Sequence, residues 1–176
     1  MINIIKSQDF KAQAKDKYYF DNNIWMYILC PIGNYNQDLQ VKSSKILSQI
    51  KSIGASIYIN QLVLSEFANA YIRLEYNIWR KGIVDGNDDF KKDFKLTQLY
   101  QETQIEIVAS LKRIIKLTTY CVDLLAIDMS SVINNMTKID FNDSYYIELC
   151  KKENFKLVSN DRDFRTINAD LDLIIL

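Results

Sequence analysis

The chain has 176 residues, 48% of them hydrophobic, and its 22 basic and 22 acidic side chains cancel to a net charge of zero. This length and composition are typical of one soluble globular domain and exclude a disordered chain, so residues 1–176 are predicted to form a single domain. The chain contains no histidine, which excludes Ser-His-Asp and Cys-His nucleophiles, histidine-bound zinc and imidazole bases. Any catalysis must rest on carboxylates, a lysine, a cysteine or a metal.

Charge, cysteines and hydropathy narrow the class of protein further. A net charge of zero gives no overall field that attracts nucleic acid, so such a partner would need a local basic patch. Cys30, Cys121 and Cys150 are widely spaced and include no CxxC pair, which favours reduced core thiols over disulfides or a zinc site. No stretch approaches the roughly 20 apolar residues of a membrane span, and the N-terminal apolar run is too short for a signal peptide. The sequence therefore predicts a cytoplasmic protein with no membrane partner.

The first half of the chain alternates short strands with helices. Tyr18–Phe20 predicts a strand, after which Asn22 or Asn23 can cap a short helix that ends before Pro31. A second helix is predicted by apolar residues that share one face: Leu39, Ile46, Ile50 and Ile53. Ala55–Ile59 predicts another strand, and Asn60 can cap the helix that follows it.

The middle of the chain predicts two helices joined by a polar segment. That segment, from Arg80 to Lys95, contains two of the four glycines and is predicted to be a loop. A long amphipathic helix from Leu96 is predicted by the spacing of Leu99, Ile107, Leu111, Ile114 and Ile115.

The last third returns to short elements. The predicted strands are Cys121–Ile127, Phe155–Val158 and Leu171–Leu176, and the predicted helices are Ser130–Met136 and Asn142–Glu153. Apolar strands that alternate with helices are typical of an α/β fold, a three-layer α/β/α sandwich around a mainly parallel sheet.

Four acidic residues occupy corresponding places in these elements. Asp21 and Asp161 each follow a predicted strand, whereas Glu66 and Asp143 each lie early in a predicted helix. Strand ends and the starts of the following helices converge on one crevice in an open α/β sheet. The pattern therefore predicts an acidic pocket, which indicates a divalent metal ion.

Clustered carboxylates without a cation repel one another. Two unit charges about 4 Å apart interact by roughly 4 kcal/mol at an effective dielectric constant near 20, which raises carboxyl pKa values. Mg²⁺ or Mn²⁺ would reverse the sign of that field and suits hard oxygen ligands. Such an ion lowers the pKa of a bound water and orients it for in-line attack on phosphorus. A phosphodiester is the substrate best served by this arrangement.

Each acid also has a structural interpretation. A lone Asp after a strand is more often a loop or cap residue, and Asp140 can cap the helix that begins near Asn142. Asp163 can contact a metal through water or cap the turn before Phe164. Glu66 lies among apolar residues, which favours a ligand role or a partner such as Arg73, because burying an unpaired carboxylate is costly.

Together these fragments resemble the PIN-domain family, and most closely the VapC-type toxins of bacterial toxin–antitoxin pairs. The fragments are FDNNIWMYI, VLSEFANAY, the helix that Asp143 opens, and SNDRDF, whose Asp161 follows Asp143 by 18 positions. Ser159 stands where the family usually has Thr. Two further departures are Tyr145 and Tyr146 in place of small residues, and extra length between Tyr76 and Leu96.

The resemblance implies an Mg²⁺- or Mn²⁺-dependent endoribonuclease that leaves a 5′-phosphate and a 3′-hydroxyl, with a small antitoxin protein as partner. The implied metal ligands or water-orienting groups are Asp21, Glu66, Asp143 and Asp161, with Asp163 as a further metal contact. Side chains that would orient these ligands are Asn23, Ser159 and Asp140. Alternative functions are a housekeeping RNA-processing nuclease, a nuclease acting on DNA, and a PIN-like binding module without turnover.

A nuclease also needs cations that hold the phosphate backbone. The predicted substrate-binding residues are Arg73, Arg80, Lys81, Lys91, Lys92 and Lys95. The alternative is an ordinary solvated face, because the same segment contains Asp85, Asp88, Asp89 and Asp93. The aromatic residues, including Trp25 and Trp79, are more typical of core or homodimer contacts than of base stacking.

Overall fold

The computed structural model describes residues 2–84, 86–121 and 127–176. Its strands are β1 (Asn3–Lys6), β2 (Lys17–Phe20), β3 (Ser56–Ile59), β4 (Tyr120–Cys121), β5 (Phe155–Ser159) and β6 (Asp172–Ile175). Its α-helices are α1 (Asn22–Leu29), α2 (Gln37–Ser52), α3 (Gln61–Arg80), α4 (Gln98–Leu117), α5 (Met129–Asn135) and α6 (Phe141–Glu153). Short 3₁₀ turns occur at Pro31–Gly33, Phe94–Leu96 and Asp163–Thr166.

The described strands form one sheet in the order β1-β6-β5-β2-β3-β4, and all its neighbours are parallel. Phe20 pairs with Val158, and Ser159 pairs with Ile175, so β2, β5 and β6 end at the same edge of the sheet. Residues that directly follow these strands are therefore brought together, which is the basis of the site described below.

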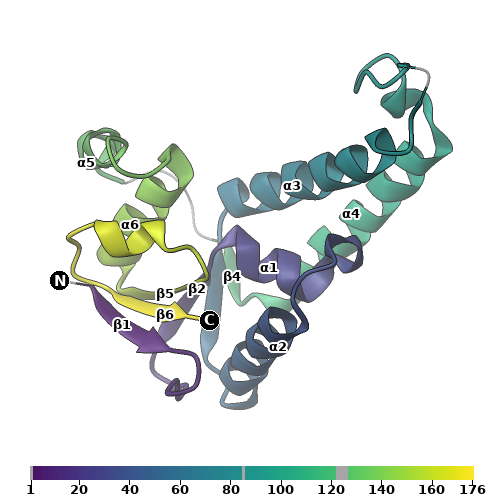
Figure 1. The fold of residues 1–176 in the computed structure, drawn as a ribbon. Helices are drawn as coiled ribbons and strands as arrows, with labels where there is room; N and C mark the ends of the chain where they lie inside the picture. Colours follow the sequence, from purple (N-terminus) through teal and green to yellow (C-terminus); the bar gives the residue numbers. More distant parts are fainter. Residues whose placement is uncertain (1, 85, 122–126) are drawn as a thin grey trace.

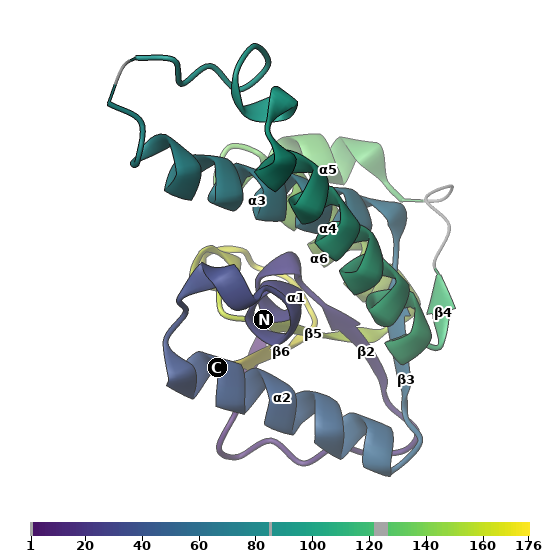
Figure 2. The ribbon, with the colours of Figure 1, turned by 90° about the vertical axis from the view of Figure 1, so that its right-hand side faces the viewer.

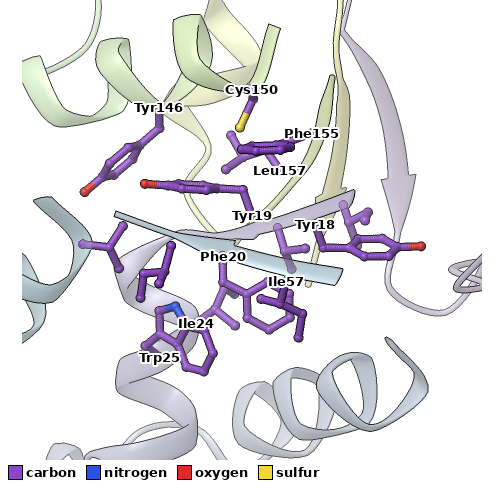
Figure 3. Packing of buried hydrophobic residues seen from close by; sticks show 14 of the residues in the cluster. Tyr18, Tyr19, Phe20, Ile24, Trp25, Ile57, Tyr146, Cys150, Phe155 and Leu157 are labelled. Carbon is purple, nitrogen blue, oxygen red and sulfur yellow. The ribbon is translucent and has the colours of Figure 1, made fainter. Parts of the chain in front are cut away.

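Helices cover both faces of the sheet, as the three-layer prediction requires. Figure 3 shows Tyr19, Leu157 and Tyr146 on one side of β2, whereas Phe20 and Trp25 lie on the other. The first side is covered by α6, on which α5 packs, and the second by α1 and α2 (Figures 1 and 2). The predicted fold class is confirmed.

Helix starts follow the capping residues of the sequence, with one correction. Asn60 caps α3 as predicted, because its Oδ1 accepts a 3.1 Å hydrogen bond from the Val63 amide. The cap of α1 is Asp21, and not Asn22 or Asn23 as predicted. Both asparagines lie inside the helix, so Asp21 both terminates β2 and starts α1.

The predicted strands at Tyr18–Phe20, Ala55–Ile59, Phe155–Val158 and Leu171–Leu176 are confirmed within one or two residues. β1 was not predicted; its four residues pair with β6, which lies more than 160 residues later in the sequence, and with no other described strand. Of the strand predicted from Cys121 to Ile127, residues 122–126 lie outside the described part of the chain. Cys30 and Cys150 are buried free thiols as predicted, and the side chain of Cys121 is likewise outside the description.

α3 and α4 pack as an antiparallel pair that projects beyond the sheet (Figure 1). Their connection has no α-helix among its described residues, as predicted, but it is not a simple polar loop. Phe94 is completely buried and lies in an aromatic cluster with four neighbours: Tyr76, Trp79, Phe90 and Tyr100. The predicted loop therefore contributes a buried ring to the packing of α3 against α4.

Two residues of the predicted apolar helix faces do not belong to the core. Ile53 and Ile115 are exposed, because Ile53 lies just past the end of α2 and Ile115 lies on the outer face of α4. No helix in the described part of the chain has the length and apolar character of a membrane span.

Candidate active site

Asp21 lies at the carboxyl end of β2 and is only 4% exposed. Its Oδ1 accepts a 2.6 Å hydrogen bond from the Asn22 amide, and its Oδ2 accepts hydrogen bonds from Asn23 Nδ2 and, at 2.7 Å, from the Ser159 hydroxyl. Both oxygens are therefore fixed by groups on two different elements. The predicted orienting roles of Asn23 and Ser159 agree with these contacts.

Ser159 connects Asp21 to Asp161 across neighbouring strands. Ser159 is completely buried, and its Oγ accepts hydrogen bonds from the Asp161 amide at 2.9 Å and from Asn23 Nδ2 at 3.0 Å. Asp161 in turn accepts a 2.8 Å hydrogen bond from the Asp163 amide at its Oδ1. The SNDRDF segment is thereby folded into a tight turn against β2.

Asp143 is half-buried in the first turn of α6. Its backbone amide donates a 2.9 Å hydrogen bond to Asp140 Oδ1, so Asp140 is the cap of this helix. The carboxylate of Asp143 makes no hydrogen bond with any other described residue. The prediction that Asp140 caps this helix is thus confirmed. The exposed carboxylate of Asp140 also lies close enough to Asp143 and Glu66 to raise their pKa values.

Glu66 lies in the second turn of α3 and contacts α6. The Tyr146 hydroxyl donates a 2.6 Å hydrogen bond to Glu66 Oε2, and the Asn142 side chain lies close enough to lower the pKa of Glu66, which burial raises. Arg73, which the sequence offered as a partner for Glu66, forms no ion pair within the described residues. The groups that hold the Glu66 carboxylate are therefore neutral, and none of them supplies a positive charge to balance it.

The carboxylates raise one another's pKa values. Burial raises the pKa of Asp143 to about 8, and further rises come from the charges of Asp21, Asp140, Asp161 and Glu66. Burial also raises the pKa of Asp21 to about 7, with smaller rises from Glu66 and Asp161, although the Ser159 hydroxyl and the Asn22 amide oppose them. The four acids predicted from the sequence thus lie in one electrostatic neighbourhood.

The donor set fits a hard divalent cation, since carboxylate oxygens suit Mg²⁺ and Mn²⁺. Within the described residues, however, no three acidic or cysteine side chains are close enough to form a complete ligand group. Asp143 has no hydrogen bond that would prevent its carboxylate from turning. The residues therefore match such an ion in chemistry and charge, without a fully preformed ligand cage.

Asp163 has a different environment from the four central acids. It is exposed at the start of a 3₁₀ turn, where its carbonyl oxygen accepts a 2.7 Å hydrogen bond from the Thr166 hydroxyl. Asp163 is the first residue of this turn, and the cap position is Arg162, so the predicted capping role of the Asp163 side chain is wrong. Its position two residues after Asp161 keeps it beside the pocket.

A groove leads from the acidic pocket along α3. Next to Glu66 it contains a cavity of about 450 Å³, lined in part by Asn69, Arg73 and Asn142. Arg73 also lines the two adjoining cavities, toward Tyr27 on α1 and toward Phe90 in the α3–α4 connection. Its guanidinium is exposed and has no partner among the described residues, so it is available to an anion.

The remaining predicted cations lie farther away. Arg80, Lys81, Lys91, Lys92 and Lys95 are all exposed at the outer end of the α3–α4 pair (Figure 1). Arg80 ends α3, 14 residues beyond Glu66, which corresponds to about 21 Å along a helix axis. Arg80 forms an ion pair with Asp88, and the Lys95 ammonium lies 5.6 Å from the centre of the Phe90 ring.

Sequence reasoning missed Tyr146 and Asn142 as groups that contact Glu66. Both flank Asp143 on α6, but nothing in their spacing reveals that α6 faces α3. The two tyrosines in this segment did stand out as a departure from small residues, and that signal pointed to the correct position.

Comparison with known proteins agrees with this arrangement. A family model described as "PIN domain" matches residues 18–169. Among solved structures, the crystal structure of PAE2754 from Pyrobaculum aerophilum matches with a TM-score of 0.50 and 14% identity, over 93% of this chain and 86% of that one. At this identity the likeness supports the fold alone. A search of curated proteins gave no match.

Proposed function

Because the chain belongs to the PIN domain family, whose members are generally nucleases, we propose that it is a metal-dependent endoribonuclease. The observation that supports this proposal is the environment of Asp143, whose carboxylate is half-buried among the charges of Asp21, Asp161 and Glu66. A fold gains nothing from such a cluster, whereas a cation site requires one.

When bound, Mg²⁺ or Mn²⁺ would offset the negative charge of the pocket and lower the pKa of a water for attack on phosphorus. The residues that would hold the ion are Asp21, Glu66, Asp143 and Asp161, with Asp163 as a contact through water. Ser159 and Asn23 keep the Asp21 carboxylate in one orientation, because both donate to Oδ2. Ligands that are fixed in this way lose little freedom when the ion binds.

The groove beside Glu66 would hold the substrate strand. Arg73 lies seven residues beyond Glu66 on α3, about 10 Å along the helix axis. At that distance its free guanidinium would pair with a backbone phosphate next to the cleaved one. Arg80 and the lysines at the end of the α3–α4 pair would contact a long RNA, but not a short one.

Cleavage of a labelled single-stranded RNA tests the activity. The wild-type protein should cut it with Mg²⁺ or Mn²⁺, give 5′-phosphate ends and stop in excess EDTA, whereas a DNA of the same sequence should be cut more slowly. Asp143→Asn should lose at least about 10²-fold in rate, since a metal ligand contributes several kcal/mol. Asp170→Asn, an exposed acid outside the pocket, is the matched control. Cleavage that persists in EDTA would contradict the proposal.

We further propose that the nuclease is the toxin of a toxin–antitoxin pair. The support is the resemblance of FDNNIWMYI and SNDRDF to VapC-type toxins. Expression of the wild-type protein should arrest growth, and Asp143→Asn should not. Co-expression of a small DNA-binding protein encoded by the neighbouring gene should restore growth. A housekeeping nuclease would be tolerated in both forms.

A further inference from the structure

We propose that Tyr146 is a positioning residue that, with Asn142, fixes the Glu66 carboxylate and thereby sets the affinity of the pocket for a divalent cation. This inference rests on the proposed function, because it assigns Glu66 to the metal site. It concerns a residue that never touches the ion or the RNA. Its basis is the contact between α6 and α3.

The contact is short and lies in a fixed environment. Tyr146 is completely buried, and its hydroxyl lies 2.6 Å from Glu66 Oε2. Its ring packs against that of Tyr19, with centroids 5.4 Å apart. A hydroxyl that donates to a carboxylate is among the stronger hydrogen bonds in proteins. A buried ring with two rotatable bonds therefore holds one oxygen of Glu66 in a defined place.

The same helix also carries Asp143. Tyr146 follows Asn142 by four residues and Asp143 by three, so it is a neighbour of both on the surface of α6. One turn of α6 thus supplies one acid of the pocket and orients another that comes from α3. The spacing between Asp143 and Glu66 is consequently set by α6, and not only by the sheet.

Figure 3 shows that the hydroxyls of Tyr19 and Tyr146 point to the same side of the core. The two hydroxyls differ in their hydrogen bonds: the Tyr146 hydroxyl donates to Glu66, whereas the buried Tyr19 hydroxyl has no hydrogen-bond partner among the described residues. Loss of the Tyr19 hydroxyl should therefore leave Glu66 in place. The orienting role belongs to Tyr146.

The chain offers a closely matched control for a test. Tyr71 is 1% exposed, and its hydroxyl donates a 2.7 Å hydrogen bond to Glu106 Oε2, between α3 and α4. Tyr71→Phe and Tyr146→Phe thus remove the same group from the same kind of tyrosine–glutamate pair. Only one of these pairs belongs to the pocket.

The experiment compares Mn²⁺ binding by calorimetry at one fixed pH in the wild-type protein, Tyr146→Phe and Tyr71→Phe. Tyr146→Phe should weaken Mn²⁺ binding by about 10-fold or more, in line with losses of groups that orient metal ligands. It should also lower kcat for RNA cleavage while KM for RNA stays unchanged, because Arg73 and the groove are intact. Tyr71→Phe should alter neither quantity.

Asn142→Ala provides a second route if Tyr146→Phe does not fold, which circular dichroism reveals. It removes the other partner of Glu66 from a partly exposed position and should weaken Mn²⁺ binding to a smaller degree. Wild-type affinity in both Tyr146→Phe and Asn142→Ala would overturn the inference, and so would equal losses in Tyr146→Phe and Tyr71→Phe. A wild-type protein that binds no Mn²⁺ and cuts no RNA would instead overturn the proposed function, together with the inference that rests on it.

Discussion

The Ser159 hydroxyl donates a 2.7 Å hydrogen bond to Asp21 Oδ2, across 138 positions of the sequence. This contact exists because β2 and β5 are neighbours and end at the same edge of the sheet. The same hydroxyl oxygen accepts a hydrogen bond from the Asp161 amide. One buried oxygen therefore connects Asp21, which follows β2, with Asp161, which follows β5.

Ser159→Ala should therefore impair both stability and cleavage. It removes one hydrogen bond each from Asp21, Asn23 and Asp161 and leaves the part-buried Asp161 amide without its partner, which should lower the free energy of unfolding by about 1–3 kcal/mol. The rate of RNA cleavage should fall by roughly 10- to 100-fold, because Asp21 loses a group that orients it. Ser159→Thr keeps the hydroxyl and should retain most of the rate. Urea unfolding and single-turnover cleavage measure the two effects, and a fully active Ser159→Ala would contradict the assigned role.

The metal-free protein should lose stability as pH rises from about 4 to about 8. In the folded state the pKa values are about 7 for Asp21 and about 8 for Asp143, against an ordinary value of 3.8. The folded protein thus holds protons that the unfolded chain releases, so this stabilisation is complete below pH 4 and disappears as pH passes through the folded values. The free energy of unfolding in EDTA should fall by at least about 2 kcal/mol across that window.

The matched variant for this effect is Asp143→Asn, which removes one of the carboxyl groups whose pKa is raised. Its stability in EDTA should exceed that of the wild-type protein at pH 8 and vary less with pH. Added Mg²⁺ should stabilise the wild-type protein and have little effect on the variant. Equal pH dependence in the two proteins would show that Asp143 is ionised normally in the fold.

Two variants of Asp140 should show whether this residue only caps α6 or also contacts the metal. Asp140→Ala removes the acceptor for the Asp143 amide and should destabilise the protein by about 1 kcal/mol. Asp140→Asn keeps a capping oxygen and should preserve stability. If Asp140 acts only as a cap, Asp140→Asn should also cleave RNA at the wild-type rate, whereas a metal contact would make it slow. Thermal unfolding and cleavage assays of the two variants distinguish these roles.

Arg73 and the distal lysines should differ in the length of RNA that they affect. Arg73→Gln should weaken binding of both a tetranucleotide and a long RNA, and should reduce the slope of log affinity against log salt by about 1. Replacing Lys91, Lys92 and Lys95 together with Gln should weaken binding of the long RNA alone. Fluorescence anisotropy at several salt concentrations measures this. Tetranucleotide binding that depends on the lysines would place the substrate path elsewhere.

The sequence predicted those parts of the fold that depend on local pattern. β2, β5 and α3 follow from short apolar runs and from a side-chain cap at Asn60. β1 could not be predicted in this way, because its four residues become a strand by pairing with β6, far along the sequence. Phe94 was also missed, since the polar residues around it conceal a ring that four aromatic neighbours bury.

In the candidate site, likewise, some residues could be predicted from local pattern and others could not. Asp21, Glu66, Asp143 and Asp161 could be selected because strand ends and helix starts meet at one edge of a parallel sheet. Their hydrogen-bond partners could be anticipated only within the motifs, as for Asn23 and Ser159. The bond from Tyr146 to Glu66 depends on how α6 faces α3, and helical periodicity alone carries no information on that contact.

The order of the strands also governs when the pocket can form during synthesis of the protein. β5 and β6 lie between β1 and β2 in the sheet, although they are translated last among the described strands. A nascent chain that ends before residue 155 has already exposed Asp21, Glu66 and Asp143, but it lacks Ser159 and Asp161. Its β2 has only β3 as a neighbour, with the opposite edge open until β5 inserts. The acidic pocket is therefore completed by β5 and the residues that follow it, which leave the ribosome after Asp21, Glu66 and Asp143, so cleavage activity should begin only after these residues have been translated.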